Sequence, residues 1–99
     1  MLSTLAITEI WVDATRRLCA RTAEPLDLIY RSAMEVHWDS AGYLYSPPPR
    51  EWSYARWMQQ FRDAVRSEYK RELVVTDGTS WHDIDAVVRR ELEHALAQP

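Results

Sequence analysis

The residue types best suited to metal or acid–base chemistry stand together near the end of the chain, as His82, Asp83 and Asp85. One imidazole and two carboxylates at a helix N-terminus are ligands that several divalent metals accept. Aspartate at the start of a helix also has a structural role, because it caps backbone N–H groups and complements the helix dipole. We therefore expect no metal or cofactor, and keep a small metal-dependent enzyme around these three residues as an alternative.

Other side chains that could act in catalysis are isolated in the sequence. Cys19 is the single cysteine, and nothing near it indicates the base or the lowered pKa that a nucleophilic thiol needs. His37 and His94 have no partner at metal-ligand spacing. Gly42 and Gly78 are the only glycines and stand far apart, which argues against a glycine-rich phosphate loop. We expect no catalytic residues and no enzymatic activity.

The densest chemical feature is a block of aromatic residues between Trp38 and Trp57, placed around the proline run 47–49. Tyr54 and Trp57 keep helical spacing, so we assign them to the core. The other aromatic residues flank turns and prolines, where large rigid side chains serve either to close a small core or to bind a partner. The residues predicted to bind are Trp38, Tyr43, Tyr45 and Trp52.

A row of basic residues follows the aromatic block at helical spacing. Arginine can bind phosphates or carboxylates through two parallel hydrogen bonds. The row can also be a solvated face that pairs with the acidic last segment of the chain. We predict that part of it extends the partner-binding surface, namely Arg56, Arg62 and Arg66.

Length and charge limit the classes of function. The chain has 99 residues, a net charge of −3 and 46% hydrophobic residues, which is typical of one small globular domain. Residues 50–71 carry a modest positive excess between two acidic segments, far less than the basic footprint of a general nucleic-acid binder. Arginine strongly outnumbers lysine, which suggests a GC-rich bacterial or phage genome. Without an evident signal peptide or membrane span, we expect a cytoplasmic protein.

Apolar residues near the N-terminus recur at steps of three and four, which predicts a helix over residues 4–21. Asp13 and Arg17 have the acid-before-base spacing of four that stabilises helices. The predicted apolar face consists of Ile7, Ile10, Trp11, Ala14 and Leu18.

Pro25 suits the first turn of a helix, and the apolar positions after it predict a second helix over residues 26–38. The alternative is a strand over residues 34–38, in which residues 39–42 form a hairpin loop into a strand at 42–46. We favour the helix because its register continues from Leu26 without a break.

A third helix is predicted over residues 54–71, with Ser53 as its cap. The β-branched run that follows predicts a short strand over residues 72–76, closed by the turn dipeptide Asp77-Gly78.

A last helix is expected to begin at Ser80, because Ser80 and Asp83 have the spacing of a capping box. It should end before Pro99. The sequence therefore predicts a helix-dominated α+β fold, with four helices and one or two short strands, at about 42–46 and 72–76, in a single compact domain.

The predicted function is binding of another macromolecule. We expect a small bacterial or phage protein that acts through protein–protein contacts, as an inhibitor, immunity factor or accessory subunit. Binding of nucleic acid by the arginine-rich helix over residues 54–71 is the main alternative. Surplus aromatic residues in so short a chain also make a homodimer a reasonable expectation.

Overall fold

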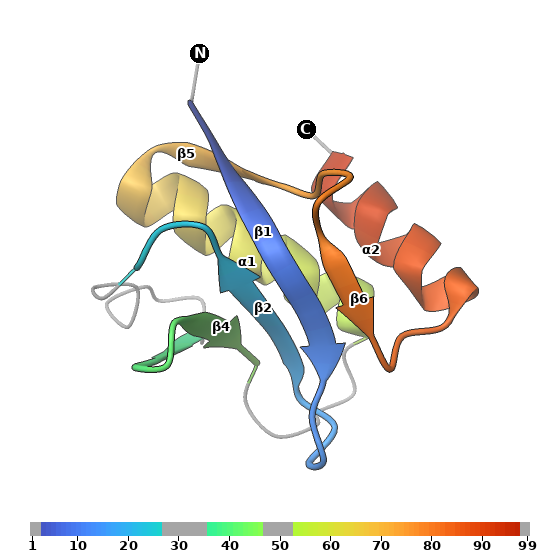
Figure 1. The fold of residues 1–99 in the computed structure, drawn as a ribbon. Coiled ribbons are helices and arrows are strands. Elements are labelled where there is room, and N and C mark those ends of the chain that lie inside the picture. The colour runs from blue at the N-terminus through green and yellow to red at the C-terminus, as the bar shows by residue number, and fades with distance from the viewer. Residues whose placement is uncertain (1–2, 27–35, 47–52, 98–99) are drawn as a thin grey trace.

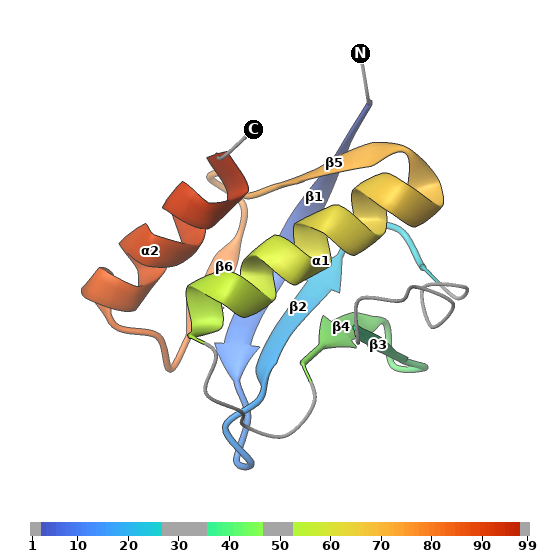
Figure 2. The ribbon, with the colours of Figure 1, turned by 180° about the vertical axis from the view of Figure 1, so that it is seen from behind.

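A six-stranded mixed sheet forms the centre of the fold, and two helices pack on one side of it (Figures 1 and 2). This architecture comes from a computed structural model that describes residues 3–26, 36–46 and 53–97. The prediction of a helix-dominated fold with four helices is therefore wrong. The elements are β1 (Ser3–Val12), β2 (Leu18–Thr22), β3 (His37–Asp39), β4 (Tyr43–Tyr45), α1 (Tyr54–Tyr69), β5 (Arg71–Val74), β6 (Ser80–His82) and α2 (Ala86–Ala97).

The strand order places β1 inside the sheet rather than at its edge. The order is β3-β4-β2-β1-β5, and β6 also pairs with β1. Strands β5 and β6 lie one after the other along the same side of β1, and both run parallel to it. Thr79 lies in the segment between β5 and β6. Its hydroxyl donates a hydrogen bond to the Ile7 carbonyl at 2.6 Å, which fixes this segment to the middle of β1.

The helix predicted over residues 4–21 is instead an antiparallel hairpin of β1 and β2. A β-bulge between Ile7 and Glu9 inserts one extra residue, so Ile7 and Ile10 are both buried although they are three positions apart. A bulge thus imitates the three-residue step of a helix. The predicted pair of Asp13 and Arg17 does form, at 2.8 Å, but it closes the hairpin turn.

A second hairpin joins β3 to β4, so the predicted helix is wrong at residues 37–38 and the alternative of a hairpin is correct there. Leu26 and Val36 are not helical either, and residues 27–35 of that prediction lie outside the described residues. The turn has two causes in the sequence. Asp39 accepts a hydrogen bond from the Ala41 backbone N–H at 2.7 Å, and Gly42 adopts a φ of 100°, a conformation that glycine takes without strain.

Helix α1 confirms the third predicted helix. The Ser53 hydroxyl caps its start by accepting a hydrogen bond from the Arg56 backbone N–H. Its end is the left-handed residue Lys70, whose N–H binds the Arg66 carbonyl. The buried residues of the helix recur at helical spacing, as Trp57, Met58, Phe61, Arg62, Ala64 and Val65.

The predicted strand over 72–76 is present as β5, at residues 71–74. The last helix begins later than predicted, because Ser80 starts the short strand β6. Its cap is Asp85, which accepts a hydrogen bond from the Val88 backbone N–H at 2.9 Å. The predicted capping box of Ser80 and Asp83 is therefore wrong, and the cap lies five residues after Ser80.

The two helices cover one face of the sheet, which we call the covered face. The core lies between this face and the helices. Leu5, Ile10, Leu44, Phe61 and Leu92 are at most 1% exposed and belong to one cluster. Strands and helices from the whole chain therefore share a single core. Within the described residues, no helix is long and apolar enough to cross a membrane.

Candidate functional site

The second face of the sheet carries a dense set of aromatic and charged side chains. Side chains alternate along a strand, so the residues between the core positions point away from the helices. No described element packs over this side of the sheet in Figure 1. We call it the open face, and define it by Glu9, Trp11, Cys19, Arg21, His37, Asp39, Tyr43, Tyr45, Ser80 and His82.

Arg21 is the hub of the open face. Its Nε donates to the Glu9 carboxylate at 2.9 Å, and its terminal nitrogen donates to the Ala41 carbonyl at 2.6 Å. The guanidinium also lies 5.6 Å from the ring centre of Trp11 and 5.7 Å from that of Tyr43. One side chain thus links β1, β4 and the turn between β3 and β4.

The aromatic rings contact one another as well as the arginines. Trp11 and Tyr43 meet edge to face at 4.9 Å, a favourable geometry for aromatic pairs. Tyr45 has His37 stacked on it at 5.3 Å and the Arg17 guanidinium over it at 4.7 Å. These contacts hold the rings in place and cover part of their flat surfaces.

Cys19 lies beneath this layer and is only 1% exposed. Burial raises the pKa of its thiol to about 12, and the nearby Asp13 carboxylate adds to the increase. The thiol points to the Arg17 carbonyl, at 3.6 Å. At neutral pH it is therefore protonated and a poor nucleophile.

The ionisable groups of the open face are largely paired within the chain. Glu9 binds Arg21 and also lies 3.3 Å from the Nε2 atom of His82. Burial raises the pKa of the Tyr43 phenol, and the neighbouring Asp39 carboxylate raises it further. The phenol is accordingly a neutral hydrogen-bonding group.

The residues of the open face fall mainly within the segment that a known family shares. The family model described as Integron Cassette Protein Hfx_Cass5 matches residues 5–79. The chain belongs to the Hfx_Cass5 family of integron cassette proteins. One member with a solved structure, "Structure from the mobile metagenome of North West Arm Sewage Outfall: Integron Cassette Protein Hfx_Cass5", is 39% identical. The match covers 99% of this chain and 100% of that one, with a TM-score of 0.48. No curated protein matches.

The family segment contains β1 to β5 and α1, whereas β6 and α2 lie beyond it. Eight of the ten open-face residues are inside the segment, and only Ser80 and His82 fall outside. The family description states no activity, so the interpretation of the site depends on its geometry.

The structure separates the four predicted aromatic residues. Tyr43 and Tyr45 lie on the open face. Trp38 alternates to the covered face, where it packs against the core. Trp52 lies outside the described residues. The residues that the sequence analysis missed are on β1 and β2, above all Trp11 and Arg21.

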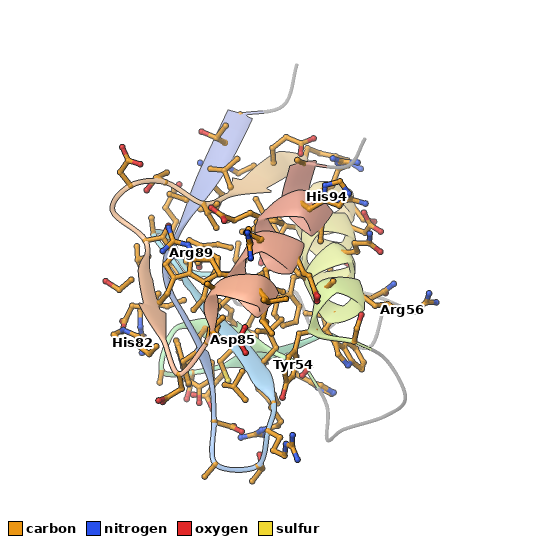
Figure 3. The ribbon with its side chains drawn as sticks, turned by 90° about the vertical axis from the view of Figure 1, so that its right-hand side faces the viewer. Tyr54, Arg56, His82, Asp85, Arg89 and His94 are labelled. Carbon is orange, nitrogen blue, oxygen red and sulfur yellow. The ribbon has the colours of Figure 1, made fainter. Side chains whose placement is uncertain are left out.

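The three predicted arginines also occupy different environments along α1. Arg56 is exposed near the start of the helix and points outward in Figure 3. Arg62 is buried and donates to the Ala95 carbonyl of α2 at 3.0 Å. Arg66 pairs with Glu72 of β5 at 2.8 Å. Two of the three therefore join elements of the fold instead of forming a continuous basic surface.

The alternative metal site does not gather into a ligand set. His82 and Asp85 lie on different elements (Figure 3), where His82 approaches Glu9 and Asp85 caps α2. Among residues 3–26, 36–46 and 53–97, no three His, Cys, Asp or Glu side chains are grouped as metal ligands.

Proposed function

We propose that the chain is a cytoplasmic protein-binding module whose binding surface is the open face of the sheet. It would act as an inhibitor, immunity factor or accessory subunit. The supporting observation is the cluster of Trp11, Tyr43, Tyr45 and Arg21, held together by ring and guanidinium contacts. Tryptophan, tyrosine and arginine are the residues that most often dominate binding energy in protein interfaces.

The contacts within this cluster reduce the entropy cost of binding. A free aromatic or arginine side chain loses rotamer freedom when a partner immobilises it. Here Arg21 is already fixed by Glu9 and the Ala41 carbonyl, and the rings pack on it. The surface is thus largely preorganised.

An enzymatic role receives less support from this site. Cys19 is a buried thiol with a raised pKa, and His82 pairs with the Glu9 carboxylate at 3.3 Å rather than with that thiol. Acid–base catalysis needs a group placed to react with a substrate. We therefore propose binding without catalysis.

Binding of single-stranded nucleic acid is also less well supported. Such proteins present exposed aromatic faces and a positively charged groove. Here guanidinium and imidazole groups already contact the rings. The open face also carries the carboxylate of Asp39 and that of Glu9, which pairs with Arg21.

Site-directed photo-crosslinking in cells that carry the gene cassette would test the proposal. A photoreactive residue replacing Tyr43 should form an adduct with a protein. The same residue replacing Val87, an exposed side chain of α2, should not. Excess unlabelled wild-type chain should compete for the adduct, whereas the W11S variant should compete poorly.

Two results would contradict the proposal. The first is equal crosslinking at positions 43 and 87. The second is tight binding of a single-stranded oligonucleotide by the wild type that is lost in W11S. This binding would have to weaken steeply between about 50 and 200 mM salt, because such salt dependence is characteristic of phosphate contacts.

A further inference from the structure

We infer that the protein partner of the open face is a second copy of this chain, packed sheet against sheet about a two-fold axis. This inference rests on the proposed function, because it requires the open face to bind protein. It adds the identity of the partner and the direction of the axis.

The strand register arranges the open face in two rows across the sheet, and we name them by their content. In each row the residues come from β3, β4, β2, β1 and β6 in turn. The charged row is Asp39, Tyr43, Arg21, Glu9 and Ser80. The aromatic row is His37, Tyr45, Cys19, Trp11 and His82.

The two rows differ in charge. The charged row contains two carboxylates, Asp39 and Glu9, but only one guanidinium, that of Arg21. The aromatic row contains no carboxylate and has a histidine at each end, His37 and His82, both exposed. If the two rows face each other, each carboxylate of the charged row therefore meets a neutral or protonatable side chain of the aromatic row.

A two-fold axis parallel to the rows brings unlike rows together. Rotation about it places the charged row of each copy against the aromatic row of the other. Asp39 then faces His37 of the second copy, and Tyr43 faces Tyr45. Because the axis is two-fold, each of these contacts occurs twice.

Other arrangements are less favourable. An axis parallel to the strands would place the charged row against itself and Arg21 against Arg21. Both axes keep the strands of the two sheets aligned, as is common in β-sandwiches, but the axis along the rows avoids this repulsion. The open face is thus complementary to itself in one direction.

Sedimentation analysis of the full chain over a range of concentrations tests this inference. The wild-type chain should form a dimer, and W11S should weaken the dimer at least tenfold. H37E should also weaken it about tenfold, because a carboxylate would face Asp39 of the other copy twice. H37K, of similar size, should associate as well as the wild type or more tightly.

The control is V87S, which changes an exposed residue of α2 on the other side of the sheet and should leave the dimer unchanged. Circular dichroism should show the same fold for all variants, and Y43S would replace W11S if that variant failed to fold.

A wild-type chain that stays monomeric at about 500 μM would overturn the inference. So would a dimer that neither W11S nor H37E weakens, or one that H37E and H37K weaken equally. If the chain is monomeric but a photoreactive residue at position 43 still crosslinks to another protein, a second copy is excluded as the partner and the proposed function is retained.

Discussion

Ile10 and Trp11 are neighbours on β1, yet their side chains lie on opposite faces of the sheet. Ile10 is fully buried between the sheet and the helices. Trp11 is only partly covered and contacts Tyr43 and Arg21. The covered face is apolar and packed, whereas the open face is aromatic, charged and held by polar contacts. One strand thus supports the fold with alternate residues and leaves the others available for binding.

The difference between the faces predicts that substitutions on the covered face cost the most stability. Ile10→Ala should lower the free energy of unfolding by about 4 kcal/mol, because it leaves a cavity among packed core residues. Urea denaturation of the variant measures this loss. A loss below about 1 kcal/mol would mean that the core is not packed as described.

The helix layer over the covered face gives the second-largest expected effect. Arg62 is buried and joins α1 to α2 through the Ala95 carbonyl, with Asp63 as its ion-pair partner at 3.0 Å. Arg62→Ala should lower the free energy of unfolding by about 3 kcal/mol, since it removes one partner of a buried polar contact.

The matched control for Arg62 is Arg56→Ala, on the exposed side of the same helix. Its cost should be about 0.5 kcal/mol or less. Equal costs for the two arginines would contradict the assignment of Arg62 as a structural residue.

The β1–β2 turn should contribute less, and in a pH-dependent manner. Burial of Asp13 by itself would raise its pKa, but hydrogen bonds from Arg17 and Thr15 outweigh this and lower the pKa. Its contribution is therefore complete above the unfolded-state pKa of about 4 and is lost as the pH falls through the lower folded-state pKa. Asp13→Asn should cost about 1.5 kcal/mol at pH 7.

Urea denaturation at pH 7 and at pH 2.5 measures this dependence. The difference between wild type and Asp13→Asn should shrink at the lower pH. Asp77→Asn, in the exposed turn after β5, should change little at either pH. A difference that stays constant with pH would show that the carboxylate charge is not the cause.

The open face should show the smallest effect on stability. Trp11→Ser should cost about 1 kcal/mol, because it removes one edge-to-face contact and one cation–π contact while the core stays intact. Thermal and urea denaturation would measure it. A cost as large as that of Ile10→Ala would place Trp11 in the core and remove the distinction between the faces.

The parts of the fold that could be predicted are those whose local sequence and final environment agree. Helix α1 has a serine cap and apolar positions at helical spacing, and it was found at nearly the predicted residues. Strand β5 overlaps the β-branched run that precedes the turn dipeptide Asp77-Gly78. In both places the local preference and the tertiary packing favour the same structure.

The first hairpin could not be predicted because two of its features resemble a helix. The bulge at Thr8 separates Ile7 from Ile10 by three positions. The hairpin turn contains no glycine, proline or asparagine, and instead Arg16 takes a φ of 67°. Asp13 accepts hydrogen bonds from the Thr15 and Arg17 backbone N–H groups in this turn, but in the sequence it fits equally well as the acid of a helical Asp13–Arg17 pair.

The open face was missed for the same reason. A helix over residues 4–21 places Trp11 on the apolar face, so this prediction gives neither Trp11 nor Arg21 a role in binding. Once the strands and their register are known, alternation alone places Trp11, Arg21 and Tyr43 side by side. The prediction of Tyr43 and Tyr45 as binding residues rests on the turns beside them, and both lie on the open face.

The hydrogen bond from the Thr79 hydroxyl to the Ile7 carbonyl joins residues 72 positions apart, which bears on the order of folding. Strand β1 is made before its partners β5 and β6, which come much later in the chain. Pairing between distant segments slows folding, since a long loop must close first. Until β5 and β6 emerge, one side of β1 has no strand to pair with, and an unpaired edge invites aggregation. The sheet can therefore be completed only after β6 has been synthesised.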